Sequence, residues 1–149
     1  MDLNYSLAVM TIVSFIIQMF VMSIIMTNSV SNITFSLGKF YISVIMALLM
    51  GLLEIIMYDT QMKTVSTIYY IVFMFLLVIF LYIYRNQVYI DDEEYLKEMI
   101  EHHSMAILTS EEILQKTKSE LVKRLAENID ITQQKEIEFM KKLINNTFN

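Results

Sequence analysis

The sequence predicts an all-α protein in which three transmembrane helices precede a soluble antiparallel helical hairpin. Three long apolar runs fill the first part of the chain, and apolar residues at helical spacing follow in the second. Charged residues become much more frequent where the apolar runs end, near Arg85. Two basic and three acidic residues precede Arg85, whereas nine basic and thirteen acidic residues lie from Arg85 onward. We therefore expect a membrane domain at residues 1–85 and a soluble domain at residues 86–149.

Composition limits the possible partners. The 149 residues are 56% hydrophobic with a mean hydropathy of +0.50, which is too apolar for a soluble domain of this size. The formal net charge of -5 argues against a nucleic-acid partner, which would need a basic face. Because the chain has no cysteine, a site for a soft metal ion would depend on histidine and methionine.

The three apolar runs have the length of membrane spans. They cover about residues 7–26, 40–58 and 68–84, and a helix needs about 17–25 apolar residues to cross the hydrocarbon core. The first run is expected to remain as a span, because its leader "MDLNYS" lacks the basic residues of a cleaved signal peptide. We therefore expect a multi-pass protein of the lipid bilayer.

The second expected span carries a functional candidate. Met50, Glu54 and Met57 recur at helical spacing on one face. Thioethers around a carboxylate could form a path for soft cations, and a carboxylate inside a membrane is costly enough to be a functional candidate by default. The alternative is that the methionines are flexible apolar filling and that Glu54 is neutral or hydrogen-bonded to a neighbour. We regard this structural alternative as the more frequent case.

Three spans place the N-terminus and the soluble domain on opposite sides of the bilayer. Counting basic residues near the spans gives Lys63 on the N-terminal side, against Lys39, Arg85 and Lys97 on the other side. Because basic residues are enriched on the cytoplasmic side, this count weakly favours a cytoplasmic soluble domain.

Two helices are expected in the soluble domain. Asp91 or Asp92 can cap the first helix, and "TKSE" at residues 117–120 has the form of a capping box for the second. The helices then cover about residues 92–116 and 119–144, and the short link between them predicts an antiparallel hairpin. A hairpin of this size buries little apolar surface by itself, so we expect a homodimer that completes a four-helix bundle.

Polar residues interrupt the apolar faces of both expected helices at matching positions. On the first helix, His103 lies at the centre of the apolar face, His102 at its edge, and Met99 about one turn before them. On the second helix, Glu136 lies within the apolar face with Gln133 beside it. An antiparallel hairpin brings the two sets opposite each other, where a buried carboxylate and a buried imidazole can be partners.

Two separated motifs in these helices agree with a known family in both identity and spacing. The first, Met-Ile-x-His-His-x-x-Ala-Ile, begins at Met99, and the second, Gln-x-x-Glu-Ile-x-x-Met, begins at Gln133. The dipeptide Leu125-Ala126 lies between them at the family's spacing. On these motifs, residues 91–144 resemble the family known as domain of unknown function 305.

The resemblance implies a ferritin-like helical domain. Members of that family have been linked to copper binding and copper tolerance outside the cytoplasm, and one branch has several N-terminal membrane spans. The resemblance therefore implies a copper ion as ligand and an extracytoplasmic soluble domain, against the weak indication of the basic residues. Two positions depart from the family pattern: Glu101 stands where proline is usual, and Thr109 stands where many members have another methionine.

Chemistry and resemblance together predict membrane-tethered copper sequestration or delivery. Imidazole and thioether groups suit copper, Cu(I) especially, and carboxylate or amide groups could orient the rings or bind Cu(II). The expected metal ligands are Met99, His102, His103, Glu136 and Met140, with Gln133 in a supporting position.

Two other classes of function stay open. The histidines and Glu136 could form a structural polar network that fixes helix register or dimer pairing, and its imidazoles could make that pairing sensitive to pH. An enzyme of the di-iron oxidase kind ranks last, because such sites need a Glu three residues before a histidine and neither histidine has one. We therefore expect no enzymatic activity.

Overall fold

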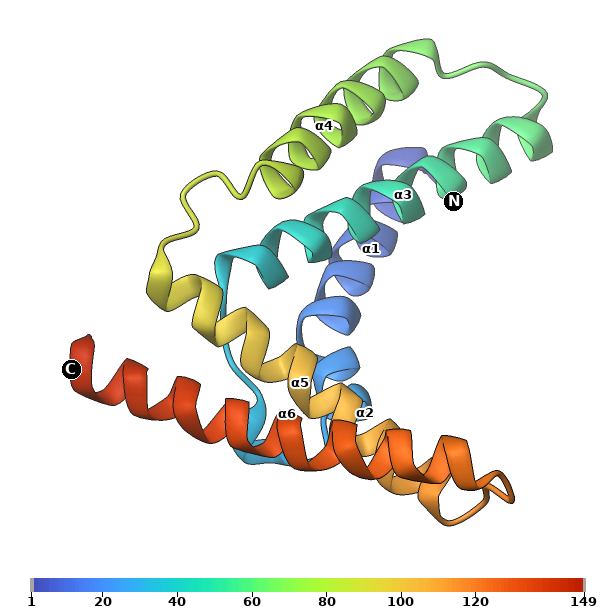
Figure 1. The fold of residues 1–149 in the computed structure, drawn as a ribbon. Helices are drawn as coiled ribbons and strands as arrows, with labels where there is room; N and C mark the ends of the chain where they lie inside the picture. Colours follow the sequence, from blue (N-terminus) through green and yellow to red (C-terminus); the bar gives the residue numbers. More distant parts are fainter. Residues whose placement is uncertain (1, 149) are drawn as a thin grey trace. The chain divides into compact units, whose positions relative to one another are not determined.

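The computed structural model describes residues 2–148, and the regular elements of these residues are all helices (Figure 1). This confirms the predicted all-α class. In chain order the elements are α1 (Leu3–Ile16), the π-helix η1 (Ile17–Val21), α2 (Met22–Met26), the 3-10 helix η2 (Val30–Asn32), α3 (Leu37–Met62), α4 (Thr67–Arg85), α5 (Asp92–Leu114) and α6 (Glu120–Thr147).

The contacts between these elements divide the chain into two compact units. Unit 1 contains the described residues up to Val21 together with Leu37–Tyr89. Unit 2 contains Met22–Ser36 together with the described residues from Ile90 onward. The segment 22–36 therefore folds with the C-terminal helices, although its sequence reads as part of the membrane domain.

Three helical stretches are long and apolar enough to cross a membrane. They are Leu3–Met26, Leu37–Met62 and Thr67–Arg85, which confirms the three predicted apolar helices. Each begins before its predicted apolar run, because helical hydrogen bonding continues into the polar residues that flank the run. Many of their large apolar side chains are exposed, which is the surface that lipid tails would cover.

In unit 1, α3 packs against both α1 and α4. Ile55 of α3 is fully buried in a cluster that includes residues of α1 and aromatic side chains of α4. One turn earlier, a Cβ atom at Gly51 would lie 2.8 Å from Thr11 Cγ2 and still closer to the ring of Phe73. Glycine therefore permits the close approach of the three helices, as small residues do in membrane bundles.

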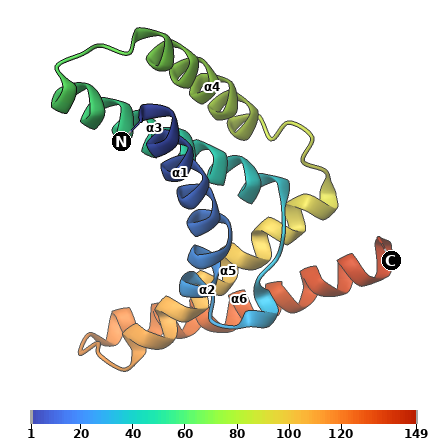
Figure 2. The same ribbon diagram turned by 180° about the vertical axis from the view of Figure 1, so that it is seen from behind.

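In unit 2, α5 and α6 pack side by side, and both views show α6 running back along α5 (Figures 1 and 2). Ile100 and Ile107 of α5 are each 1% exposed and form a core with Ile137 and Met140 of α6. Burial of such side chains stabilises a fold by about 1.5–3 kcal/mol each. This core holds the two helices in register and so positions the polar residues beside it.

Side-chain caps determine where α5 and α6 begin. Asp91 Oδ1 accepts a hydrogen bond from the backbone N–H three residues later over 2.9 Å, which confirms one of the two predicted caps of α5. At α6 the cap is Ser119, and the prediction that Thr117 opens a capping box is wrong. Ser119 Oγ accepts from the Val122 N–H over 3.4 Å, so α6 begins at Glu120, whereas Thr117 Oγ1 accepts from the Ser119 N–H over 3.2 Å.

Candidate functional site

His103 of α5 and Glu136 of α6 meet where the two helices pack. His103 Nδ1 lies 3.1 Å from Glu136 Oε2, and the two side chains are 20% and 47% exposed. The carboxylate oxygen lies out of line with the ring nitrogen, so Nδ1 is buried without a hydrogen-bond partner among the described residues. The structure thus brings together the two residues that the sequence places opposite each other. The buried Nδ1 atom of His103 has lost its hydration, and no hydrogen bond compensates for that loss.

Two thioethers lie in the core beside this pair. Met140, one turn after Glu136, is 7% exposed, and Met99, about one turn before His103, packs against the cluster that contains Met140. Because α6 runs back along α5, residues that precede His103 and residues that follow Glu136 lie at the same end of the helix pair. The structure therefore gathers both predicted thioethers on one side of the imidazole–carboxylate pair.

The other two predicted site residues have different positions. His102 is exposed on α5, and Gln133 is half-buried on α6. Within residues 2–148, no group of three or more His, Cys, Asp or Glu side chains is arranged to hold a metal ion. The nitrogen and oxygen donors that come together in one copy are thus those of His103 and Glu136, without His102.

A polar network elsewhere on α5 holds the segment 22–36, and the helical spacing of the sequence does not predict it. Glu101 Oε1 accepts a hydrogen bond from the Thr34 backbone N–H over 2.7 Å, and its Oε2 accepts one from the Ser23 hydroxyl over 3.2 Å. The Thr34 hydroxyl donates to the Lys97 carbonyl over 2.6 Å. Glu101 therefore has a structural role in this chain, because it holds the segment 22–36 against α5.

Ser104 lies at the centre of the same network and has no exposed surface. Its hydroxyl donates to Asn28 Oδ1 over 2.7 Å and accepts from the Asn28 backbone N–H over 3.0 Å. Asn32 donates to Asn28 Oδ1 over 2.9 Å and accepts from the Lys141 ammonium of α6 over 2.5 Å. These polar groups satisfy one another, as buried polar groups must. The Ser- and Asn-rich stretch at residues 27–32 was the sequence signal that could have indicated them.

The two helices of unit 2 differ in charge. α5 carries seven acidic residues and one basic residue, Lys97, whereas α6 carries five of each. Lys97 Nζ lies 2.7 Å from Glu93 Oε1, and this hydrogen bond, together with the charge of Glu94, raises the pKa of Lys97. On α6, the hydrogen bond from Lys142 lowers the pKa of Glu138. The remaining acidic residues of α5 give that helix an excess of negative charge.

In unit 1, the membrane candidates lie on α3. Glu54 and Met50 are half-buried, and Met57 is exposed. A carboxylate that the sequence analysis did not single out, Asp59, is buried at the end of the same helix. Its oxygens accept hydrogen bonds from the backbone N–H and the hydroxyl of Ser66, each over 2.7 Å. Asp59 therefore fixes the turn that leads into α4.

Comparison with known proteins adds a family and a relative. The family described as "Domain of unknown function (DUF305)" matches residues 90–148, which include the stretch where the two motifs indicate the resemblance. The "Uncharacterized protein L153" of Acanthamoeba polyphaga mimivirus is 34% identical over 141 residues, which cover 95% of this chain and 92% of that protein. No solved structure matches the chain. The similarity to the viral protein extends over both the apolar helices and the C-terminal helix pair.

Proposed function

Because the chain belongs to the family described as domain of unknown function (DUF305), we propose that it is a membrane-tethered protein that binds Cu(I) between α5 and α6. One observation carries the proposal: the buried Nδ1 of His103 lies 3.1 Å from Glu136 Oε2 without a hydrogen bond. A buried polar atom without a partner costs about 1–3 kcal/mol. A cation held by the two side chains would remove that cost.

The donors beside this atom fit a copper ion. Two ligand atoms that each lie about 2.0–2.2 Å from one ion are separated by roughly 2.8–3.6 Å at ordinary coordination angles, and 3.1 Å lies in that range. Met99 and Met140 add thioethers, which select Cu(I) over harder ions. A zinc or di-iron site would need more His and carboxylate ligands than this pair supplies. The proposed ligands are His103, Met140 and Met99, with Glu136 as a further ligand or as the group that orients the imidazole.

Neither His102 nor Gln133 is among the proposed ligands. His102 is exposed and does not join His103 and Glu136 in one donor group within the described residues, so we assign it no inner ligand role. Gln133, half-buried on α6 three residues before Glu136, keeps the supporting role of orienting the side chains of the site. The role that we propose for the protein is sequestration or delivery of the ion, by a helical hairpin of the ferritin-like kind.

The contacts of the segment 22–36 support a three-span topology. Its hydrogen bonds to Glu101 and Ser104 fit a topology in which the loop before α3 and the α5–α6 pair lie on the same side of the bilayer. The chain between them contains α3 and α4, so both of these helices must cross or neither can, and both are long and apolar enough to cross. We propose that both cross, that the N-terminus lies on the opposite side, and that the helix pair is extracytoplasmic as the family resemblance implies.

A second candidate function is structural. The short distance between His103 and Glu136 also fits a polar pair that fixes the register of α5 against α6, and such pairs can specify one packing arrangement. On this alternative, Met99 and Met140 are ordinary core side chains that fill space around the pair.

Copper titration of the protein in detergent micelles separates the two candidates. Cu(I) is titrated in competition with a chelator of known affinity into the wild type and into the His103→Ala, Met140→Leu and His102→Ala variants. The copper proposal predicts one tightly held ion per chain, at least about tenfold weaker binding for His103→Ala and Met140→Leu, and little change for the exposed His102→Ala control. A wild type that holds no stoichiometric copper would leave the structural role as the function of the pair.

A further inference from the structure

The helix pair of unit 2 has one covered face and one open face. The segment 22–36 covers the side that presents Glu101 and Ser104 of α5 and Lys141 of α6. Large apolar side chains on a different side of the pair have no such cover. Leu121, Leu125 and Phe139 of α6 are 79%, 60% and 61% exposed, and Ile113 of α5 is 41% exposed. We call these four residues the open face.

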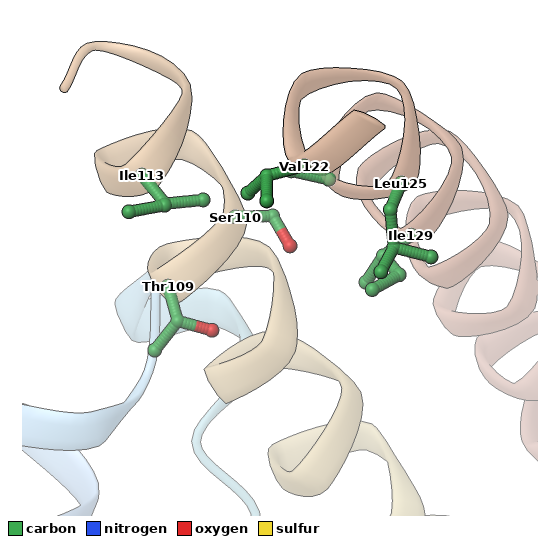
Figure 3. Close-up of a pocket in the computed structure, with 7 residues that line it drawn as sticks. Thr109, Ser110, Ile113, Val122, Leu125 and Ile129 are labelled. Carbon is green, nitrogen blue, oxygen red and sulfur yellow. The ribbon is translucent and has the colours of Figure 1, made fainter. Parts of the chain in front are cut away.

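Two residues of the open face, Ile113 and Leu125, line a hollow between the helices (Figure 3). The hollow has a volume of about 330 Å3, and its lining combines side chains of both helices, mostly apolar. Figure 3 shows Thr109, Ser110 and Ile113 on one helix and Val122, Leu125 and Ile129 on the other. Apolar surface of this kind, in a unit whose other side is already packed, is typical of an interaction site.

We propose that the open face binds the open face of a second copy of this chain, so that four helices enclose one core. Helical geometry supports the contact, because Leu121, Leu125 and Phe139 lie within about 40 degrees of one another around α6. They therefore form one row along the helix, next to the side that contacts α5. Two such rows brought together would bury apolar surface on every helix of the bundle.

Charge favours a second copy over a lipid surface as the occupant. A helix that lies on an anionic bilayer carries an excess of Lys and Arg around its apolar face. Here α6 carries five acidic and five basic residues, and α5 carries seven acidic residues against one basic residue. The helix pair is therefore repelled by anionic lipid as a whole, whereas an uncharged apolar row on another copy is a suitable partner.

The edges of the open face are also complementary in charge. Arg124 and Lys135 lie on the edge of α6 that points away from its own α5, and neither forms an ion pair within residues 2–148. The contact of His103 with Glu136 sets the register of the antiparallel helices and places Arg124 within about one turn of the level of Glu112. In a bundle with a two-fold axis along the helices, α6 of one copy lies beside α5 of the other at this register.

That arrangement puts the basic edge of each α6 next to the acidic α5 of the other copy. Glu112 now pairs with Lys116 over 3.2 Å, but both side chains are more than half exposed, and exposed pairs of this kind contribute little. Glu112 can therefore leave Lys116 and pair with Arg124 of the second copy at a small cost in free energy. Confinement of both copies to one bilayer would raise their effective concentration and favour the pairing further.

The test is the oligomeric state of the full chain in copper-free detergent micelles and in lipid vesicles. We expect a wild-type dimer, and we expect Leu125→Glu to raise the dissociation constant at least tenfold, because it places a carboxylate in the apolar contact. Gln134→Glu adds the same charge outside the open face and should leave the dimer unchanged. Both positions are exposed, so neither substitution disturbs the core, and unchanged helical circular dichroism verifies this.

Charge reversal supplies a control that misfolding cannot imitate. Arg124→Glu and Glu112→Arg should each weaken the dimer, and the double variant should restore it. A monomeric wild type, or a dimer that Leu125→Glu does not weaken, would overturn the proposal. So would a polarity-sensitive label at Leu125→Cys that reports lipid in the wild-type background, since the chain has no other cysteine to react. None of these measurements depends on copper, so the dimer and the copper site can fail separately.

Discussion

Ser104 of α5 donates a hydrogen bond to Asn28 over 2.7 Å, and this bond joins two segments that are 76 residues apart in the sequence. Asn28 returns a hydrogen bond from its backbone N–H to the same hydroxyl. The exchange makes the loop that follows the first apolar helix an integral part of the C-terminal unit. The α5–α6 pair is consequently incomplete when it is separated from residues 22–36.

Replacing Ser104 with alanine should destabilise unit 2 by about 1–3 kcal/mol, because the substitution leaves buried polar atoms of Asn28 and Asn32 with fewer partners. Ser110→Ala is the matched control: it removes a hydroxyl from another buried serine of α5 that faces the hollow and not the segment 22–36. Chemical denaturation, monitored by circular dichroism, measures the free energy of unfolding of both variants. Equal stability losses in the two variants would contradict a specific role for the Ser104 network.

Single cysteines should reveal the proposed topology, since the native chain has none. Val30→Cys in the loop before α3 and Lys118→Cys between α5 and α6 should react with a membrane-impermeant maleimide from the same side of sealed vesicles. Val65→Cys, which is exposed between α3 and α4, should react only from the other side. Reaction of all three from one side would contradict the crossing of α3 and α4.

Gly51→Ala should weaken the packing of the apolar helices, because its added Cβ would overlap Thr11 and the ring of Phe73. We expect a lower thermal unfolding temperature of the detergent-solubilised protein, by several degrees. Adding Phe73→Leu should recover part of the loss, because the smaller side chain leaves room for the new methyl group. Leu49→Ala, on an exposed part of α3, is the control that should change little, and a similar loss there would argue against a close approach at Gly51.

Ile107→Ala should cost about 2–5 kcal/mol of stability, because the side chain is 1% exposed and its removal leaves a cavity between α5 and α6. Ile131→Ala removes the same atoms from a side chain that is 54% exposed, and its cost should be well below that. Urea unfolding curves compare the two variants. If both lost the same stability, the core assigned to Ile107 would be wrong.

Much of the fold follows from simple periodicity. The apolar runs predict the three membrane-length helices because length and hydropathy decide whether a helix can cross. Helical spacing on α5 and α6 predicts that His103 and Glu136 face each other, because both positions lie on apolar stripes. The ends of the helices are less predictable. The choice between Thr117 and Ser119 as the cap of α6 depends on backbone geometry in the turn, and both residues suit a cap.

The contacts that sequence patterns do not indicate are those between distant segments. Glu101 lies outside the apolar stripe of α5, so its helical position predicts exposure, yet it binds the backbone of Thr34. The sequence similarly predicts that Asp59 is an exposed residue at the polar end of an apolar helix, but the turn at Ser66 buries its side chain. In each case a loop folds back over the side chain, and nothing in the local spacing specifies the path of that loop.

X-ray absorption at the copper edge tests the proposed site most directly. The protein would be loaded with one equivalent of Cu(I) per chain in detergent micelles and compared with its His103→Ala variant and with a Met99→Leu, Met140→Leu double variant. The account predicts both nitrogen and sulfur neighbours around copper in the wild type, loss of nitrogen signal in the first variant and loss of sulfur in the second. A spectrum that shows only nitrogen and oxygen neighbours, unchanged in both variants, would contradict a copper site between α5 and α6.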